Sequence, residues 1–361
     1  MKSYKHLYEK AQMEEVRKMA VHIVCLKRKD YKSCKEYTED EEQTVKLCEE
    51  WLEHYKNDNH KPKVIYDGIK HKKRTILVPT FKELVVQHCI MQPLIPVFMH
   101  GMYEHSYASI PNRGAHKGKK VIEKFVRKPN NKKCKYVLKM DIRKYFENID
   151  HNILKNMLSK KIHDNKMLEI LFEIIDVNDK GLPLGFYTSQ WLANWYLQSL
   201  DHYIKEDLGA DLYIRYMDDM VVFGANKKGL HRIRNKIDKY LNEILHLEMK
   251  DNWQIYLFHY IDKDGNEHGR DLDFMGFRFY RNRTTLRKSI MTNASRKAKR
   301  LSKKDKPSIY ECRQMLSYLG WIKCTDVYGM YLKYIKPYVD FGKLKERISR
   351  YDRKRVKEAL A

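Results

Sequence analysis

The stretch YIRYMDDMVVF at residues 213–223 decides the fold. Two short β-rich runs, 213–216 and 220–223, flank Asp218 and Asp219, and this order predicts a hairpin with both acids at its tip. Adjacent residues of a strand point to opposite faces, but at a tight turn both carboxylates can lean toward one point. The tip is therefore a candidate site, although two adjacent acids in a turn are more often a solvated loop.

A third acid, Asp141, ends another β-rich run, YVLKMDI at residues 136–142. If this strand lies beside the hairpin, three carboxylates converge, and such a cluster is too repulsive to stay empty and ionised. Carboxylate oxygens suit hard divalent cations, above all Mg²⁺. Two such ions about 4 Å apart would activate an attacking 3′-oxygen and stabilise a leaving pyrophosphate. The order of strand, helix and strand hairpin is typical of a ferredoxin-like split βαβ domain.

Composition narrows the class of protein. The chain has 361 residues, of which 43% are hydrophobic, so it carries enough apolar material for packed cores. Its apolar stretches are too short and too interrupted to cross a bilayer, and its first residues lack a signal core. Seven scattered cysteines without a CxxC pair fit buried thiols better than a disulfide framework. We therefore expect a cytoplasmic protein of two or three domains, with no membrane partner.

The charge of the chain is strongly positive and unevenly spread. There are 72 Lys and Arg against 47 Asp and Glu, a formal net charge of +25. Residues 281–361 alone hold 23 Lys and Arg against seven Asp and Glu. A basic face of this size attracts polyanions and predicts strongly salt-dependent binding. Solubility alone requires no such asymmetry.

Four sequence blocks in a fixed order resemble the reverse transcriptases. These blocks are KMDIRKYF (139–146), GLPLGFYTSQ (181–190) with Ala193-Asn194, YMDD (216–219) and LDFMG (272–276). They are similar to the first catalytic block, the block that contacts template and nucleotide, the second catalytic block and the primer-grip hairpin. The resemblance implies an RNA-directed DNA polymerase (a nucleotidyltransferase) that uses two Mg²⁺ ions, for which Mn²⁺ can substitute.

The resemblance also implies an α+β right-hand polymerase with fingers, a ferredoxin-like palm and a helical thumb. A turn cluster at residues 57–62 marks a plausible boundary. We expect a helical N-terminal extension over residues 1–60, fingers and palm over 61–285, and a basic helical thumb over 286–361.

The family pattern assigns roles to individual positions. The expected catalytic residues are Asp141, Asp218 and Asp219, and the expected metal ligands are Asp141, Ile142, Asp218 and Asp219. The expected dNTP-binding residues are Lys73, Arg74, Lys82, Phe146, Gly185 and Gln190. The expected template and primer contacts are Ser189, Tyr216, Met217, Phe274, Met275, Gly276, Lys323 and Lys333.

Three of these assignments have a physical reason of their own. Phe146 lies where relatives keep an aromatic gate, and its ring offers no partner for a buried ribose 2′-hydroxyl, at a cost of roughly 1–3 kcal/mol. Gly185 has no Cβ, so backbone can approach a base or sugar. Ser189 and Gln190 start a helix at the pocket edge, where polar groups suit phosphates or base edges. Their alternative role is ordinary helix capping.

Basic residues around one expected strand of the fingers are candidates for a triphosphate clamp. Arg74 is favoured over Lys73 and Lys82 because its guanidinium offers a bidentate fork. Many relatives carry an Arg two positions after Lys82, but this chain has Leu84 there. Lys250 lies near a family lysine thought to protonate pyrophosphate, but a surface lysine is the favoured interpretation.

The template-contacting block narrows the lineage. It reads Leu184-Gly185 and Ser189-Gln190, where intron and retroviral enzymes usually read Gln-Gly and Ser-Pro. This pattern resembles enzymes of diversity-generating retroelements and neighbouring bacterial lineages, some of which act in antiviral defence. The length leaves no room for a ribonuclease H or integrase domain. The resemblance implies a bacterial or phage-encoded protein whose partners are a structured noncoding RNA template, an RNA/DNA duplex and dNTPs, with a small helical accessory protein or a homo-oligomer.

Three alternatives remain open at this point. The first is a catalytically silent RNA-binding scaffold of the same fold, the second is an RNA-dependent RNA polymerase, and the third is a basic DNA-binding protein. The presence of all three acids argues against the scaffold, and Phe146 argues against the RNA polymerase.

Overall fold

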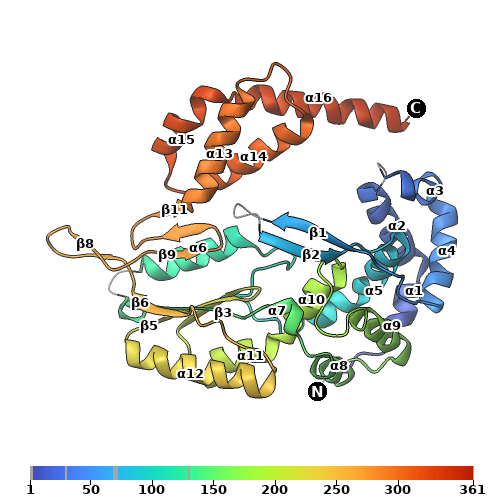
Figure 1. Cartoon of the computed structure of the whole chain (residues 1–361), viewed down its shortest axis with the longest axis horizontal. Helices are drawn as coiled ribbons and strands as arrows, with labels where there is room; N and C mark the ends of the chain where they lie inside the picture. Colours follow the sequence, from blue (N-terminus) through green and yellow to red (C-terminus); the bar gives the residue numbers. More distant parts are fainter. Residues whose placement is uncertain (1–2, 29–30, 68–71, 129–130, 361) are drawn as a thin grey trace. The chain divides into compact units, whose positions relative to one another are not determined.

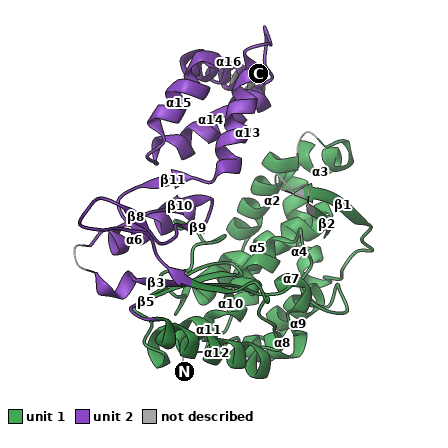
Figure 2. Ribbon diagram, turned by 60° about the vertical axis from the view of Figure 1, so that its left-hand side comes forward, with its two compact units in different colours: residues 1–114, 138–223, 227–255 green, residues 115–137, 224–226, 256–361 purple. Residues whose placement is uncertain are grey.

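The computed structural model describes residues 3–28, 31–67, 72–128 and 131–360, and Figure 1 shows the course of the chain. Two compact units are present. Unit 1 comprises residues 1–114, 138–223 and 227–255, and unit 2 comprises residues 115–137, 224–226 and 256–361 (Figure 2). Both units mix helices and β-sheet, and each is described by itself. The three-part division into extension, fingers with palm, and thumb stays a prediction.

Unit 1 begins with helices, as predicted for residues 1–60. They are α1 (Leu7–Gln12), α2 (Glu14–Arg28), α3 (Lys35–Glu39) and α4 (Glu41–Glu53). Helix α4 begins after Asp40, whose side chain accepts a hydrogen bond from the backbone N–H of Gln43 and so caps the first turn. Helix α2 buries Ala20, Val21 and Val24 and packs against α4 and α5. This apolar stripe fastens the first helices to the longer helix that follows.

A hairpin and a long helix come next in unit 1. Strands β1 (Pro62–Asp67) and β2 (Lys72–Leu77) pair in antiparallel register, and α5 (Phe81–Met99) starts with a capping box between Thr80 and Glu83. The sequence predicts that α5 is bent or divided near Pro93 and Pro96; the helix is not divided, because it runs through both prolines. Packing against α1, α2, α4 and α10 surrounds α5 and compensates for the lost backbone hydrogen bonds.

A four-stranded sheet holds the acid-bearing strands next to each other. Its strand order is β4 (Leu212–Tyr216), β5 (Asp219–Gly224), β3 (Tyr136–Asp141) and β6 (Gln254–Leu257). Strands β4 and β5 form the predicted antiparallel hairpin, with Tyr216 paired to Asp219. Both strands are buried along most of their length, which matches their continuous apolar runs.

Helices complete the core around this sheet. They are α7 (Tyr145–Asn148), α8 (His151–Ser159), α9 (Asn165–Ile175), α10 (Tyr187–Tyr196), α11 (Gln198–His202) and α12 (Lys227–Ile244). Helices α11 and α12 lie on one side of the sheet (Figures 1 and 2). The sequence predicts one helical stretch over 151–176, but it divides into α8 and α9 before Asp164. The Asp164 side chain caps α9 and also accepts hydrogen bonds from the backbone N–H groups of Leu7 and Tyr8 at 2.7 and 2.8 Å.

Unit 2 is built on a small sheet and a group of helices. Its elements are α6 (Ala115–Val126), β7 (Tyr260–Ile261), β8 (Glu267–His268), β9 (Leu272–Phe274), β10 (Phe277–Phe279), β11 (Thr284–Leu286), α13 (Lys288–Leu301), α14 (Ile309–Lys323), α15 (Tyr328–Tyr334) and α16 (Phe341–Leu360). The three-stranded sheet has the order β11-β10-β9. Its core includes Phe277, whose ring centroid lies 4.9 Å from that of Trp321.

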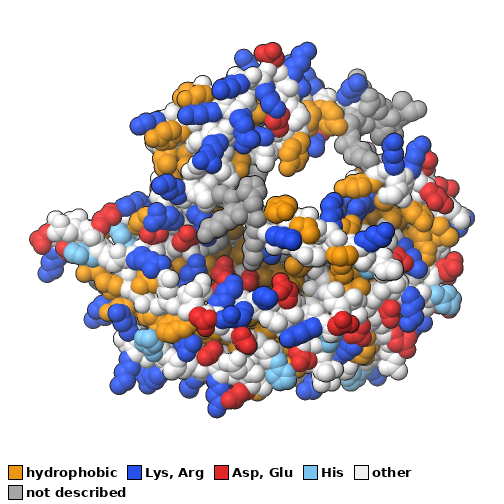
Figure 3. All heavy atoms as spheres, in the orientation of Figure 1, with side chains coloured by type: hydrophobic (Ala, Val, Ile, Leu, Met, Phe, Trp, Pro, Cys, Tyr) orange, Lys and Arg blue, Asp and Glu red, His pale blue; other side chains and the backbone are white. Residues whose placement is uncertain are grey.

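The helices of unit 2 are amphipathic and basic. Helix α13 buries Met291, Ala294 and Ala298 on one face, and Lys and Arg side chains are spread over the exposed face of α13–α16 in Figure 3. This is the charge that the sequence concentrates in residues 281–361. Among the described helices, none combines the length and the apolar character that a membrane span needs.

Candidate active site

Three carboxylates lie near one another where β3 ends and the β4–β5 hairpin turns. We call Asp141, Asp218 and Asp219 the acidic cluster. Burial, followed by the negative charges of Asp141 and Asp219, raises the pKa of Asp218 from its ordinary 3.8 to about 6. A hydrogen bond with the Asp141 side chain also raises this pKa. Residues that lie 77 positions apart in the sequence therefore share one small, electrostatically strained site.

The chemistry of the acidic cluster fits a divalent cation. One carboxylate oxygen of Asp141, Oδ1, is buried without a hydrogen-bond partner among the described residues, and burial together with the two neighbouring carboxylates raises the pKa of Asp218. Hard oxygen donors in such a setting favour Mg²⁺. Within the described parts of the chain, no three acidic, His or Cys side chains already surround one point as a metal site.

Lys250 supplies positive charge at the acidic cluster. Its ammonium donates a hydrogen bond to Oδ2 of Asp141, and its backbone N–H donates to the Asp141 carbonyl at 2.8 Å. The favoured interpretation of Lys250 as a plain surface lysine is therefore wrong, because two contacts fix it to the last residue of β3. Sequence reasoning missed this contact because a loosely aligned position gave no sign of its neighbour.

Arg215 fixes the shape of the turn that carries two of the acids. Its guanidinium is fully buried and binds both carboxylate oxygens of Asp201, at 2.7 and 2.6 Å. It also donates to Asn194 Oδ1 and to the Met217 carbonyl, each at 3.1 Å. Met217 has φ of 58°, a conformation that non-glycine residues adopt only when the surroundings hold them there. Arg215 is thus a positioning residue for the acidic cluster.

Sequence reasoning missed Arg215 and its partners, although one signal was present. A charged residue in the middle of the apolar run YIRY must be buried, and a buried charge needs a partner. Its partner, Asp201, comes from α11, a contact that no local pattern predicts. Tyr213 adds a hydroxyl that donates to Asp201 Oδ1 at 2.8 Å.

Gly185 makes a close backbone contact, but its described neighbour is protein. The backbone N–H of Leu77 donates to the Leu184 carbonyl at 2.9 Å. Gly185 has φ of 117°, and a Cβ there would lie 2.2 Å from the Leu77 carbonyl oxygen. Glycine is therefore required at this position by the close approach of strand β2. From the sequence we expected a base or sugar to make that close approach instead.

The start of α10 also differs from its prediction. The sequence predicts that Thr188 or Ser189 caps this helix, but the helix begins at Tyr187 without a side-chain cap from its own N-cap residue. Gln87 of α5 supplies the acceptor instead, taking the Tyr187 N–H at 2.8 Å. Ser189 is buried, and its hydroxyl donates to the Pro183 carbonyl at 2.7 Å. The Ser189 hydroxyl proton is therefore used to hold the 181–186 loop. The structure gives no support for the expected contact between Ser189 and a template.

The basic residues of the β1–β2 hairpin lie on opposite faces. Alternate residues of a strand share a face, so Arg74 faces with Ile76, whose Cβ is 3.8 Å from the position a Gly185 Cβ would take. Lys73 is exposed on the other face. Strand alternation therefore separates Lys73 from Arg74, and Arg74 is the one on the side of the 181–186 loop; a role of either residue in binding a triphosphate stays a prediction. Lys82 is half-buried in the first turn of α5.

Phe146 lies five residues after Asp141, in the short helix α7, and is half-buried. Its backbone carbonyl accepts a hydrogen bond from the Leu182 N–H at 2.7 Å. Its ring centroid lies 5.6 Å from that of the buried Tyr145. These contacts tie the expected gate residue to the loop that carries Gly185. Tyr216 and Met217, expected to contact template or primer, are half-buried in the hairpin turn.

The other expected primer and template residues lie in unit 2. Phe274 and Met275 are buried, so their side chains serve the core and only their backbone is available for contact. Gly276 has φ of 86°, and a Cβ there would press against Trp321 at 3.0 Å. Lys323 and Lys333 are exposed on α14 and α15.

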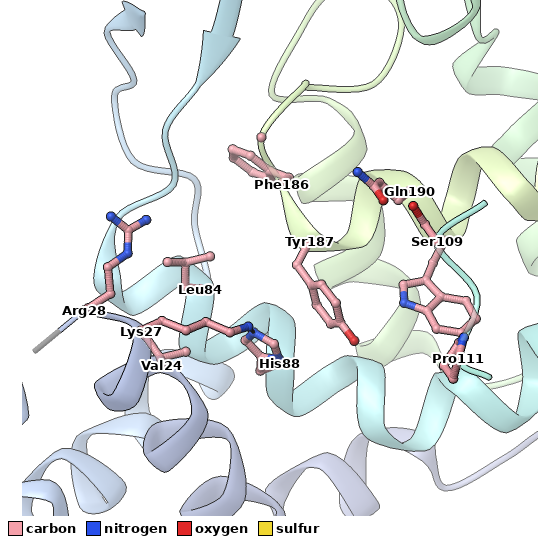
Figure 4. Close-up of a pocket in the computed structure, with 12 residues that line it drawn as sticks. Val24, Lys27, Arg28, Leu84, His88, Ser109, Pro111, Phe186, Tyr187 and Gln190 are labelled. Atoms are coloured by element: carbon pink, nitrogen blue, oxygen red, sulfur yellow. Dashed lines mark hydrogen bonds between the residues drawn. The ribbon is translucent and has the colours of Figure 1, made fainter. Parts of the chain in front are cut away.

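A cavity of about 560 Å³ adjoins the 185–190 segment in unit 1 (Figure 4). Helix α2 contributes Lys27 and Arg28 to its wall, and the palm segment contributes Gly185 and Gln190. Burial and the nearby Lys27 ammonium lower the pKa of His88 to about 4. His88 is therefore neutral at pH 7, and its ring stacks on Tyr187 with centroids 4.3 Å apart. Helix α2 thus lines the same cavity as the expected nucleotide-contacting block.

Comparisons with known proteins define the class. The family model for reverse transcriptase (RNA-dependent DNA polymerase) matches residues 38–278, and the chain belongs to this family. The structure is similar to apo telomerase from Candida tropicalis with a TM-score of 0.50 and 14% identity, over 82% of this chain and 62% of that chain. That likeness and the family match show a right-hand polymerase fold, as predicted.

Individual relatives are more distant. The retron Ec73 reverse transcriptase of Escherichia coli is 26% identical over 44% of this chain and 52% of its own length. The group II intron-encoded protein LtrA of Lactococcus lactis subsp. cremoris is 26% identical over 37% of this chain and 23% of its own length. Protein YkfC of E. coli K12 is 23% identical over 37% of this chain and 38% of its own length. The matched region therefore spans about half of the retron relative and less of the others.

Replacing Gly185 by Ala should destabilise the chain far more than the same change at Gly209. Both glycines have positive φ, so both variants carry a backbone penalty of about 1 kcal/mol. Only at Gly185 does the new Cβ collide with a backbone carbonyl, while nothing lies within 4 Å at Gly209. Denaturant unfolding should show a loss above about 3 kcal/mol for Gly185→Ala. Equal losses in the two variants would contradict the contact with Leu77.

Replacing Asp218 by Asn should stabilise the metal-free chain at pH 7.5 but not at pH 4. The folded pKa of about 6 exceeds the ordinary 3.8, so the folded state binds the proton more tightly than the unfolded state. The resulting penalty is absent below about pH 4 and complete above about pH 6. Denaturant titrations in EDTA should show a gain on the order of 2 kcal/mol at pH 7.5. Exposed Asp179→Asn is the control, and an equal gain at both pH values would refute the shared site.

Proposed function

We propose that this chain is an RNA-directed DNA polymerase that makes cDNA by two-metal nucleotidyl transfer. The observation that carries the proposal is the acidic cluster, in which Asp141, Asp218 and Asp219 come from neighbouring strands β3 and β5 and their turn. Such a cluster has no structural benefit of its own, because like charges in a half-buried site destabilise the fold. Membership of the reverse transcriptase family supports the same activity.

The acidic cluster would hold the metal ions. Asp141, Asp218 and Asp219 offer carboxylate oxygens, and Ile142 offers only its backbone carbonyl because its side chain is apolar and buried. When bound, Mg²⁺ would activate the primer 3′-hydroxyl and offset charge on the departing pyrophosphate. Lys250, whose ammonium donates a hydrogen bond to Asp141, would give an Nζ proton to that leaving group.

Residues outside the acidic cluster would select and orient the nucleotide and bind the duplex. Arg74, on the β2 face next to the 181–186 loop, would bind triphosphate oxygens through its guanidinium. Phe146, anchored to Leu182, would occupy the space that a ribose 2′-hydroxyl needs. Gln190 lines the cavity beside the loop and would meet a base edge. Lys323 and Lys333 of unit 2 would bind the phosphates of an RNA/DNA duplex.

Primer extension tests the activity directly. Purified chain, a DNA primer annealed to an RNA template, Mg²⁺ and dNTPs should give full-length cDNA. Asp219→Asn should lower the rate at least 1,000-fold, since it removes an oxygen ligand, while Asp179→Asn should leave the rate unchanged. Extension by Asp219→Asn at the wild-type rate would overturn the proposal and favour a non-catalytic scaffold.

Phe146 should set the choice between deoxynucleotides and ribonucleotides. Phe146→Ala opens space for a 2′-hydroxyl, so the ratio of kcat/KM for dNTP over rNTP should fall at least 10-fold, the equivalent of about 1.4 kcal/mol. Phe125→Ala, a half-buried Phe in unit 2, controls for the loss of an aromatic ring. A wild-type preference for rNTPs would instead identify an RNA-dependent RNA polymerase.

We further propose that the template is a dedicated structured noncoding RNA, in a diversity-generating retroelement or in an antiviral defence system. The Leu184-Gly185 and Ser189-Gln190 pairs in the template-contacting block support this setting. Sequencing of RNA and cDNA that co-purify with the chain should return one abundant RNA and its complementary DNA. A copy linked to a repeat in a target gene would indicate diversification, and a product made on phage infection would indicate defence. Recovery of unselected cellular RNA would contradict a dedicated template.

A further inference from the structure

Unit 2 contains a second basic region, a pocket of about 1040 Å³ beside the β7–β8 hairpin. Its lining residues come from the end of α6, the segment that leads into β3, and the end of β6 with β7. Of the described residues that line it, five are Lys or Arg and none is Asp or Glu: Arg127, Lys128, Lys132, Lys135 and Arg281. A volume of this size exceeds that of one small metabolite and suits part of a polymer.

Hydrogen bonds within unit 2 hold the frame of this pocket. The backbone N–H of Phe258 donates to the Lys135 carbonyl at 2.9 Å. The Arg281 guanidinium donates to the carbonyls of Val126 and Cys134, at 3.2 and 3.3 Å. These contacts tie the two chain segments of the wall to each other, so the pocket is formed before any ligand arrives.

The positive charge of the pocket is available for a ligand. Lys128, Lys132 and Lys135 are exposed, whereas Arg127 is partly engaged by Glu123 at 3.2 Å and Asp326 at 3.5 Å. The three exposed lysines therefore carry the attraction for an anion. A row of ammonium groups with no interleaved acid in the lining matches a series of phosphates.

Two of the three acids of the adjoining hairpin, Asp262 and Glu267, have side-chain partners of their own, and the third is Asp264. Asp262 accepts from His268 at 2.6 Å, and Glu267 binds Arg283 at 2.7 Å. The Arg283 cation balances the charge of Glu267. Asp262 and Asp264 oppose part of the field of the lysines, but neither acid lines the pocket.

Apolar and aromatic groups form the rest of the wall. Phe258 is buried, while Tyr260 and Ile261 remain 37% and 39% exposed. The Tyr260 ring stacks on His268 with centroids 5.1 Å apart, which holds it in place. An exposed, supported tyrosine beside lysines is the combination that binds an unpaired base by stacking while its phosphates meet the cations. An acidic protein segment could pair with the lysines but has no base to stack on the Tyr260 ring, so RNA fits the pocket better.

We propose that this pocket binds folded RNA, with phosphates on Lys128, Lys132 and Lys135 and an unpaired base on Tyr260. It is separate from the acidic cluster, which lies in unit 1. The inference deepens the proposed function, because it names a surface that would hold the template-bearing RNA outside its copied segment.

Charge reversal tests the phosphate contacts. The probe is a fluorescent 40-nucleotide RNA hairpin with an unpaired loop, titrated with full-length chain in EDTA at 50 to 200 mM KCl. The variant Lys128→Glu, Lys132→Glu, Lys135→Glu should bind at least 10-fold more weakly at 100 mM KCl. Its slope of log K against log salt should fall by about 2. Tyr260→Ala, which changes no charge, should weaken the hairpin about fivefold and a blunt RNA duplex far less.

The matched control reverses three exposed lysines elsewhere: Lys10→Glu, Lys46→Glu and Lys236→Glu. It changes the net charge equally, so any difference from it belongs to the pocket. If both triple variants bind the hairpin equally, the proposed site is wrong.

Primer extension separates this inference from the proposed function. On a short unstructured RNA template with an annealed DNA primer at saturating concentration, the pocket variant should extend at the wild-type rate. Weaker hairpin binding by a chain that never extends a primer would support the RNA site and refute the polymerase. If the wild-type chain extends primers and the pocket variant binds the hairpin as tightly as the wild type, the polymerase is supported and the RNA site is refuted.

Discussion

The buried ion pair between Arg215 and Asp201 is the constraint on which the candidate active site depends. Both side chains are fully buried, and the guanidinium satisfies both carboxylate oxygens. Loss of one partner would leave an uncompensated charge in the core, at a cost of about 3–5 kcal/mol. The same guanidinium donates a hydrogen bond to the carbonyl of Met217. Met217 has a left-handed backbone conformation and immediately precedes Asp218 in the turn. One interaction therefore links α11, α10 and β4 to the position of the acids.

The acidic cluster illustrates why such a restraint is needed. Repulsion among Asp141, Asp218 and Asp219 favours any movement that separates them. Burial, and after it this repulsion, raises the pKa of Asp218. Lys250 relieves part of the repulsion from one side. The buried β4–β5 hairpin and the Arg215–Asp201 ion pair hold the acids in place against the remaining repulsion. A site of this kind gains stability when a cation binds, which couples metal binding to the rigidity of the turn.

A second restraint joins the β1–β2 hairpin to the loop that carries Gly185. The Leu77–Leu184 hydrogen bond and the absence of a Cβ at Gly185 allow the two backbones to touch. Leu182 of the same loop is bonded to Phe146. The residues proposed to meet triphosphate and sugar are therefore tied to one loop, and a shift of that loop would change both contacts together.

The sequence predicted the features that depend on local patterns. The hairpin over residues 213–223, the strand that ends at Asp141 and the helices on either side follow from β-rich runs, turn residues and apolar spacing. Contacts between distant segments were not predictable: Asp201 beside Arg215, Gln87 at the start of α10, and Leu77 against Gly185. Strand alternation could have separated Lys73 from Arg74, but charge alone grouped them. Long-range packing chooses such partners, and a single sequence does not record it.

Thermal unfolding in the presence of Mg²⁺ tests the shared carboxylate site most directly. At pH 7.5, 10 mM Mg²⁺ should raise the Tm of the chain by several degrees relative to EDTA, because the cation binds the folded cluster and not the unfolded chain. Asp141→Asn, Asp218→Asn and Asp219→Asn should each remove most of that increase, while Asp179→Asn should keep it. An increase of wild-type size in all three cluster variants would show that these acids do not form one cation site.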